Sequence, residues 1–215
     1  MVSRPIIIIA PIVVAVALLG VVVWRSIPDI PVVEAPYAAE PTEEFFDPEV
    51  YEYVDDSERE ILKRFDEAPL TSDSFSEGIT YRLLLLPTFN KPILVQARVD
   101  AAGPYIKTKI LNGVGGYGIE KLGVLSINEE RQLTRSEWDQ LTETVRHSGF
   151  WGDPGIDRTD EPVADGASWS LYGRDFGAFH RIHRITPKPK SLELFRYLLQ
   201  LAGHEDDYRG YSTEE

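Results

Sequence analysis

Residues 165–187 read DGASWSLYGRDFGAFHRIHRITP, and this stretch decides the fold expected for the chain. Apolar and polar residues alternate on both sides of a central Gly-Arg-Asp-Phe-Gly, which predicts two strands joined by a tight turn. A two- or four-residue turn centred on the Asp-Phe step would pair Leu171 with His180 and Trp169 with Ile182. Side chains alternate between the faces of a strand, so these four would share one face.

The same register pairs Ala167 with Arg184 and places three polar residues, His180, Arg184 and Asp165, on the core side of the hairpin. Buried polar groups are costly unless they are paired, so we expect an Asp165–Arg184 ion pair. One interpretation is a polar network that holds the sheet. The other is a small site in which His180 acts as general base or ligand donor and Arg184 binds an anion. A three-residue turn or a bulge would reverse the faces.

No metal site or cofactor is expected. His180 and His183 are three residues apart, a spacing that sends them to opposite faces of a strand. The chain has no cysteine, which excludes thiolate ligands and a cysteine nucleophile. The sequence contains no G-x-S-x-G, H-E-x-x-H, P-loop or EF-hand pattern.

Elements outside the hairpin complete one α+β domain over residues 75–204. Strands are predicted at 79–89, 92–99 and 104–111, and a fourth runs from 123 toward 132. The capping box Thr134–Glu137 predicts a helix that ends at Gly149, and Ser191 is expected to cap a last helix that ends at Gly203. The order β-β-β-β-α-β-β-α predicts an antiparallel sheet packed by two helices. Residues 205–215 read as a polar tail.

A run of 20 residues without a charge, PIIIIAPIVVAVALLGVVVW at 5–24, predicts a transmembrane helix within residues 1–25. At 1.5 Å per residue it would span about 30 Å, the thickness of a bilayer core. A cleavable signal peptide is the alternative. The positive-inside rule favours a cytoplasmic N-terminus and a C-terminal domain outside the cytoplasm.

The acidic charge of the chain lies in one segment. Residues 29–77 carry 16 Asp and Glu against 3 Lys and Arg, which accounts for the whole net charge of −13. We therefore predict an acidic, proline-rich spacer over 26–74, with a short helix at 57–67 that starts at a second capping box, Ser57–Glu60. The rest of the chain is electrically balanced, so nucleic-acid binding is not expected.

Residues 113–118, GVGGYG, formally match G-x-G-x-x-G. A dinucleotide site needs this loop to open a helix within a βαβ unit, but GIEKLGVLS follows and reads as loop and strand. A turn with glycines at positive φ is the simpler interpretation. A ligand loop formed by Gly115, Gly116 and Tyr117 remains the alternative.

Several ordered motifs between Tyr81 and Gly203 resemble a family of uncharacterised bacterial proteins, often with a signal peptide or membrane anchor. They are PILVQARV, the glycine loop with Lys-Leu, LTRSEWDQL, Gly-Phe-Trp, and DGASWSLYG followed by GAFHRIHRITP. This chain has Tyr172 where the family usually has Glu, and Phe179 where Tyr is usual. The resemblance implies a bacterial envelope protein and carries no known activity.

The sequence therefore predicts a single-pass membrane protein whose periplasmic domain is a non-enzymatic binding or assembly module that contacts another envelope protein. One alternative is a hydrolase-like enzyme built on Asp165, His180 and Arg184, and another is an accessory or immunity-type protein. An enzyme predicts His180 in a concave pocket with an abnormal pKa. A binding module predicts His180 and Arg184 buried and paired, with an exposed apolar or aromatic patch elsewhere.

Overall fold

The computed structural model describes residues 48–75, 77–153, 155, 166–176 and 178–211. The predicted span at 5–24, residues 26–47 of the predicted spacer and Asp165 lie outside these residues. Within the described ranges, no helix combines the length and the apolar character needed to span a bilayer.

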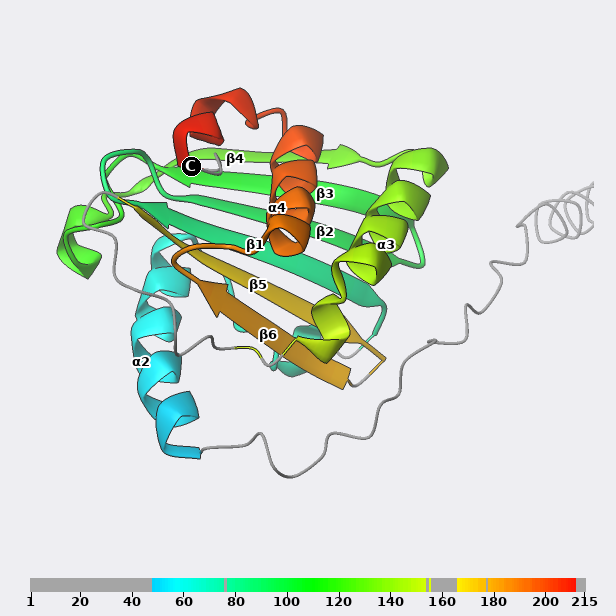
Figure 1. The fold of residues 1–215 in the computed structure, drawn as a ribbon, viewed down its shortest axis with the longest axis horizontal. Helices are drawn as coiled ribbons and strands as arrows, with labels where there is room; N and C mark the ends of the chain where they lie inside the picture. Colours follow the sequence, from blue (N-terminus) through cyan, green and yellow to red (C-terminus); the bar gives the residue numbers. More distant parts are fainter. Residues whose placement is uncertain (1–47, 76, 154, 156–165, 177, 212–215) are drawn as a thin grey trace, which may run out of the picture. The chain divides into compact units, whose positions relative to one another are not determined.

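One antiparallel sheet of six strands, in the order β4-β3-β2-β1-β5-β6, forms the centre of the fold (Figure 1). The strands are β1 (Ile79–Pro87), β2 (Ile93–Asp100), β3 (Gly103–Leu111), β4 (Leu125–Gln132), β5 (Ala167–Asp175) and β6 (Ala178–Arg184). The predicted antiparallel sheet with packed helices is confirmed. The hairpin β5–β6 joins the sheet next to β1, on the side opposite β2, so β1 becomes a central strand.

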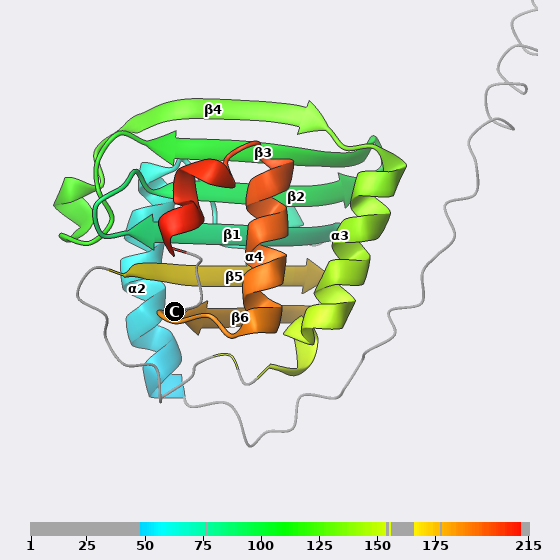
Figure 2. The ribbon, with the colours of Figure 1, turned by 45° about the horizontal axis from the view of Figure 1, so that its top comes forward.

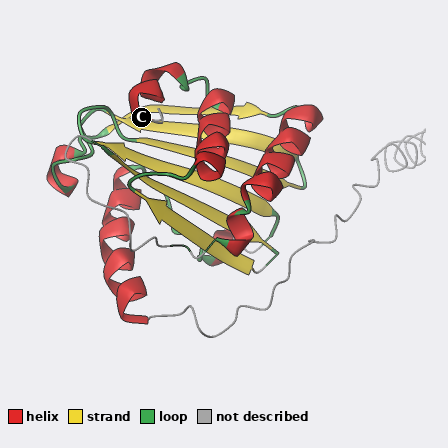
Figure 3. Cartoon of the chain, viewed as in Figure 1, coloured by secondary structure: helices red, strands yellow, loops and turns green. Residues whose placement is uncertain are grey.

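Helices cover both faces of the sheet (Figures 2 and 3). Helices α3 (Arg135–Ser148) and α4 (Pro189–Leu201) pack on one face, and α2 (Pro48–Arg64) packs on the other. Alternate residues of β1 divide between the two cores: Leu83 and Leu85 join the α3–α4 side, and Leu84 joins the α2 side. This explains the continuous apolar run in β1, as expected for a strand covered on both faces.

Helix α3 begins and ends where its sequence predicts. The Thr134 hydroxyl accepts a hydrogen bond from the Glu137 backbone N–H, and the Glu137 carboxylate accepts one from the Thr134 N–H. Gly149 ends the helix with φ of 72°, a left-handed conformation that favours glycine.

Helix α4 starts earlier than predicted, because Lys188 is its N-cap and Pro189 its first residue. The prediction that Ser191 caps this helix is wrong, since Ser191 is buried inside the first turn. Proline has φ preset for a first turn and lacks the N–H that would be left unpaired there, so it starts the helix without a side-chain cap.

Helix α2 also starts earlier than predicted, at Pro48 rather than at the Ser57 capping box. The helix continues through Ser57, so the capping-box pattern there does not mark a helix end. Leu62 in the helix and Phe65 just after it pack with Leu70, Phe75 and Leu84 in the core on the α2 side of the sheet. The segment from 57 to 75 therefore belongs to the folded domain and not to a spacer.

The region after α4 is more than the predicted polar tail. A short 3₁₀ segment, η5 (Asp206–Tyr211), buries Tyr208, whose hydroxyl donates to the Lys91 carbonyl at 2.8 Å. The Asn90 side chain donates to the Asp207 carbonyl at 2.9 Å. These two hydrogen bonds fasten the C-terminal segment to the β1–β2 turn.

The hairpin β5–β6 has the predicted faces but not the predicted partners. Leu171 pairs with Ile182, Trp169 with Arg184, and Gly173 with His180, a shift of two residues along β6 from the predicted register. The last pair, Asp175–Ala178, leaves a two-residue turn. A shift of two keeps every side chain on its face, so the face prediction holds although the pairs are wrong.

Candidate functional site

Arg184 is fully buried and makes an ion pair with the Asp153 carboxylate. Its guanidinium also donates to the carbonyls of His183, at 2.7 Å, and Gly155. The loop after α3 reaches this position because the Gly155 carbonyl accepts the His183 backbone N–H at 2.8 Å. The partner of Arg184 is therefore Asp153, whereas the predicted partner, Asp165, lies outside the described residues.

His180 packs edge-on against Phe150, with ring centroids 4.9 Å apart, and lies 6.1 Å from the Trp151 ring. Its Nε2 is buried and has no hydrogen-bond partner among the described residues. Burial lowers the pKa of the His180 imidazole below its ordinary value, and the nearby Asp153 carboxylate only partly opposes this shift. Packing therefore disfavours the protonated form of the ring.

Gly173 of β5 lies directly beneath the aromatic rings of Phe150 and Trp151. It lies between Tyr81 and His180 in the sheet, and its missing side chain leaves room for aromatic rings above the strand. A Cβ there would lie 2.5 Å from Phe150 Cε1 and 3.1 Å from the Trp151 ring. The aromatic cluster around His180 is thus a close-packed part of the core, and sequence reasoning missed it because its members are distant along the chain.

The opposite face of the hairpin holds α2. Ser170 Oγ lies 2.8 Å from His183 Nδ1, and Arg181 pairs with Glu58 of α2 at 2.9 Å while lying over the Tyr172 ring. Ser170 is buried, so this Ser–His contact presents no nucleophile to solvent. The Ser170–His183 contact joins β5 to β6, and the Arg181–Glu58 pair joins β6 to α2.

A buried charge cluster lies under the end of α2, and the sequence did not point to it. The Glu67 carboxylate contacts Lys109 Nζ at 2.7 Å and Arg82 Nη2 at 3.1 Å. Lys109 also donates to the carbonyls of Phe65 and Asp66, each at 2.8 Å, just beyond the helix end. Burial lowers the pKa of Arg82 to about 10, and Glu67 opposes that shift. The cluster anchors the chain after α2.

The glycine loop closes over the end of β1. The Gly115 N–H donates to the Pro87 carbonyl at 2.9 Å, and a Cβ at Gly116 would lie 2.7 Å from Thr88 Cα. The loop leads to the three-residue η3 (Ile119–Lys121) and then β4, not to a helix in a βαβ unit. Close backbone packing accounts for Gly115 and Gly116, and it leaves Tyr117 exposed beside Phe89.

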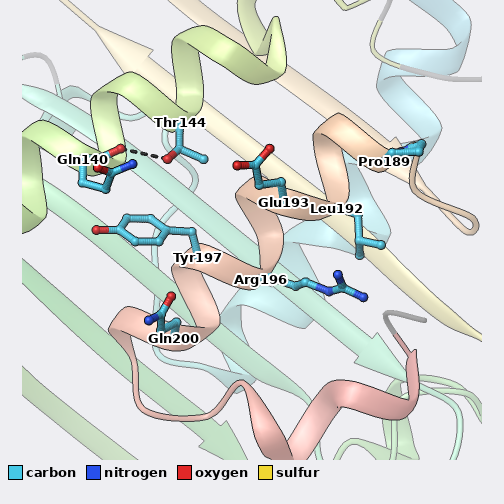
Figure 4. A pocket seen from close by; sticks show the side chains of 8 residues that line it. All are labelled: Gln140, Thr144, Pro189, Leu192, Glu193, Arg196, Tyr197 and Gln200. Atoms are coloured by element: carbon cyan, nitrogen blue, oxygen red, sulfur yellow. Dashed lines mark hydrogen bonds between the residues drawn. The ribbon is translucent and has the colours of Figure 1, made fainter. Parts of the chain in front are cut away.

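A groove of about 270 Å³ lies between α3 and α4 on their outer side (Figure 4). Its lining combines polar, apolar and aromatic side chains, and consists of Gln140, Thr144, Pro189, Leu192, Glu193, Arg196, Tyr197 and Gln200. The Thr144 hydroxyl donates to the Gln140 carbonyl at 2.8 Å, and the Tyr197 hydroxyl lies 3.4 Å from the Glu137 carbonyl. A smaller hollow of about 100 Å³ lies between β4 and the end of α4. Neither hollow is lined by His180 or Arg184.

Comparison with known proteins adds no functional assignment. No family model matches the chain, and a search of curated proteins finds no match. The resemblance to an uncharacterised bacterial envelope family therefore stays a prediction. No cluster of three or more side chains able to hold a metal ion occurs among the described residues.

His180 is expected to titrate below the ordinary histidine pKa of about 6.5 in a histidine NMR titration. Because the unfolded chain binds this proton more readily, stability contributed by neutral His180 should be lost as pH falls below about 6.5. His180→Gln should weaken that loss, with the exposed His147→Gln as the matched control. A His180 midpoint at or above 6.5 would contradict the packing argument.

Proposed function

We propose that the chain is a single-pass bacterial membrane protein whose α+β domain lies in the periplasm and binds another envelope protein without catalysing a reaction. The uncharged run at 5–24 supports the membrane anchor, since its length matches a bilayer core. Arg4 and the N-terminal amine precede the run, whereas Arg25 after it is soon followed by Asp29, and this difference favours an N-terminus inside the cytoplasm. The resemblance to membrane-anchored bacterial proteins supports the same placement.

The main support for a role without catalysis is that the candidate catalytic groups, His180 and Arg184, make packing contacts within the domain. Arg184 is fully buried against Asp153, and His180 is held among aromatic rings. A base or anion site needs these groups to face a substrate. These contacts do not support the hydrolase alternative.

The groove between α3 and α4 is the surface we assign to the partner. Tyr197 and Arg196 are half-buried there, and Gln140, Glu193 and Gln200 are exposed around them. Tyr and Arg are enriched at protein interfaces because they combine a large contact area with hydrogen-bonding groups. Both helices are fastened to the sheet by the first core, so the groove presents a preformed surface.

Site-directed photo-crosslinking in the native membrane tests this assignment. A photoreactive residue at Gln200, in the groove, is expected to form one discrete adduct with an envelope protein, and Arg196→Ala should weaken it. The matched control is the same residue at Lys63, which is exposed on α2 on the other face of the sheet. Identical adducts from both positions, or none from Gln140 and Gln200, would refute the groove as the interface.

Two further measurements test the membrane part of the proposal separately. The protein should remain in the membrane pellet after alkaline extraction. A reporter fused after Glu215 should be active only outside the cytoplasm, and activity only inside would overturn the proposed orientation.

A further inference from the structure

The two outer edges of the sheet differ in how they are covered. At the β6 edge the Gly155 carbonyl accepts the His183 backbone N–H, and a Cβ at Gly155 would lie 2.9 Å from the Arg181 carbonyl oxygen. At the other edge, formed by β4 (Figure 1), residues 128–132 are all exposed. Among the described residues no backbone group forms a hydrogen bond with the outer side of β4. An open edge of this kind is a template for another strand.

The hydrogen bonds between β4 and β3 show which backbone groups of β4 point outward. The Leu133 N–H donates to the Pro104 carbonyl at 2.9 Å, so these two residues form a hydrogen-bonded pair. Hydrogen-bonded and non-hydrogen-bonded pairs alternate along an antiparallel ladder, so every second residue of β4 directs its N–H and C=O away from β3. These outward residues are Asn128, Glu130 and Gln132.

The outward residues are symmetric about Glu130. If the β4 strands of two copies run antiparallel with Glu130 opposite Glu130, Asn128 of each copy faces Gln132 of the other. Each facing pair of outward residues exchanges two backbone hydrogen bonds, so all three outward positions find partners. The Asn128 and Gln132 side chains then also lie opposite each other on one face, where amides can hydrogen-bond across the strands.

The charges of β4 favour the same register. Glu129 and Arg131 lie on the α3–α4 face, where Arg131 donates to the Leu201 carbonyl and the Glu137 carboxylate, each at 2.8 Å. With the axis at Glu130, Glu129 of each copy lies opposite Arg131 of the other, which is an attractive cross-strand pair. An axis moved by one residue either way would set Glu129 opposite Glu129, or Arg131 opposite Arg131.

The register leaves one pair of like charges facing each other. The two Glu130 side chains would meet on the α2 face, where Lys107 lies 3.7 Å from the Glu130 carboxylate of its own copy. The lysine beside each carboxylate reduces the repulsion. Arg135, just beyond the strand, already pairs with Asp139 of its own helix at 2.9 Å. Glu130→Gln is therefore expected to strengthen the association.

We propose that two copies of this chain associate through antiparallel pairing of their β4 strands about Glu130, which continues the six-stranded sheet of one copy into that of the other. The Gln132 carbonyl also accepts the Arg131 guanidinium at 3.2 Å, and its second lone pair remains for the incoming N–H. The inference depends neither on the membrane anchor nor on the groove between α3 and α4.

The absence of cysteine allows a direct test of the register with the full-length protein in mild detergent. With Glu130→Cys the two Cα atoms would be about 5.5 Å apart, within the range of a disulfide, so mild oxidation should link two copies. Asn128→Cys or Gln132→Cys alone should give no linked dimer, because like positions would be about 14 Å apart. The two variants expressed together should form a disulfide with each other.

A proline tests whether strand pairing causes the contact. Asn128→Pro removes an outward N–H, and an edge strand tolerates proline where its N–H faces solvent. The domain should stay folded by circular dichroism while the Glu130→Cys dimer is lost, and Asn128→Ala is the matched control that should keep it. No disulfide at 130, equal linking at 128, 130 and 132, or a dimer that persists with Asn128→Pro would overturn the inference.

A photoreactive residue at Glu130 in intact cells tests which molecule occupies the edge. The expected product is a dimer of this chain. An adduct with a different protein and no dimer would assign the β4 edge to a strand of that protein and would refute the pairing of two copies.

Discussion

Replacing Trp169 with alanine is expected to lower the free energy of unfolding by about 3–5 kcal/mol, the usual range for removing a large aromatic side chain from a core. The Trp169 indole is completely buried and stacks on Phe195 of α4, with ring centroids 5.2 Å apart and planes only 8° from parallel. Its removal would leave a cavity between the hairpin and α4. Because α4 packs on the sheet through this contact, the helix should loosen before the rest of the fold.

Urea denaturation followed by circular dichroism measures the loss of stability, and hydrogen exchange reports which helix loosens. Phe176→Ala is the matched control, since that ring is 70% exposed and should contribute little to stability. Similar losses from the two substitutions would contradict the assignment of Trp169 as the link between the hairpin and α4.

Replacing Glu67 with alanine is expected to cost about 3–5 kcal/mol, because breaking a buried ion pair leaves uncompensated charge in the core. Glu67 is the carboxylate between Arg82 and Lys109, and all three side chains are almost entirely buried. Without it, two buried cations face each other beneath the end of α2. The expected result is release of α2 from its face of the sheet while α3 and α4 remain packed on the other.

Hydrogen exchange along α2 tests this expectation, together with urea denaturation of the whole protein. Glu60→Ala is the control, since Glu60 pairs with Lys63 on the exposed side of the same helix and exposed pairs contribute little. Unchanged protection in α2 after Glu67→Ala would show that the apolar contacts of Leu62 and Phe65 hold the helix without the ion cluster.

Several features of this protein follow from local sequence alone. The alternation in β5 and β6, combined with a turn of two or four residues, predicted the faces of Trp169, His180 and Arg184, because a strand has a period of two. The capping box at Thr134 and the glycine at 149 marked both ends of α3, because a helix end needs partners for its own backbone groups. Each of these signals depends on residues within a few positions of one another.

Other features depend on residues that meet only after folding. The pairing of β5 with β1, the Asp153 partner of Arg184 and the packing of Phe150 over Gly173 join segments far apart in sequence. The ion pairs of Glu67 with Arg82 and Lys109, just beyond α2, also join segments far apart in sequence. The acidic, proline-rich composition of this segment instead suggested a spacer.

The hairpin combines a feature that its sequence predicted with contacts that only the folded structure shows. Its sequence predicted which side chains face the core if the turn has an even number of residues, and this prediction holds despite an error of two residues in register, because such a shift preserves the faces. Only the tertiary structure decided what those side chains touch. Phe150 and Trp151 pack against His180, and Asp153 pairs with Arg184. These contacts come from the segment that follows α3, which is far from β6 in sequence and meets it only in the folded chain.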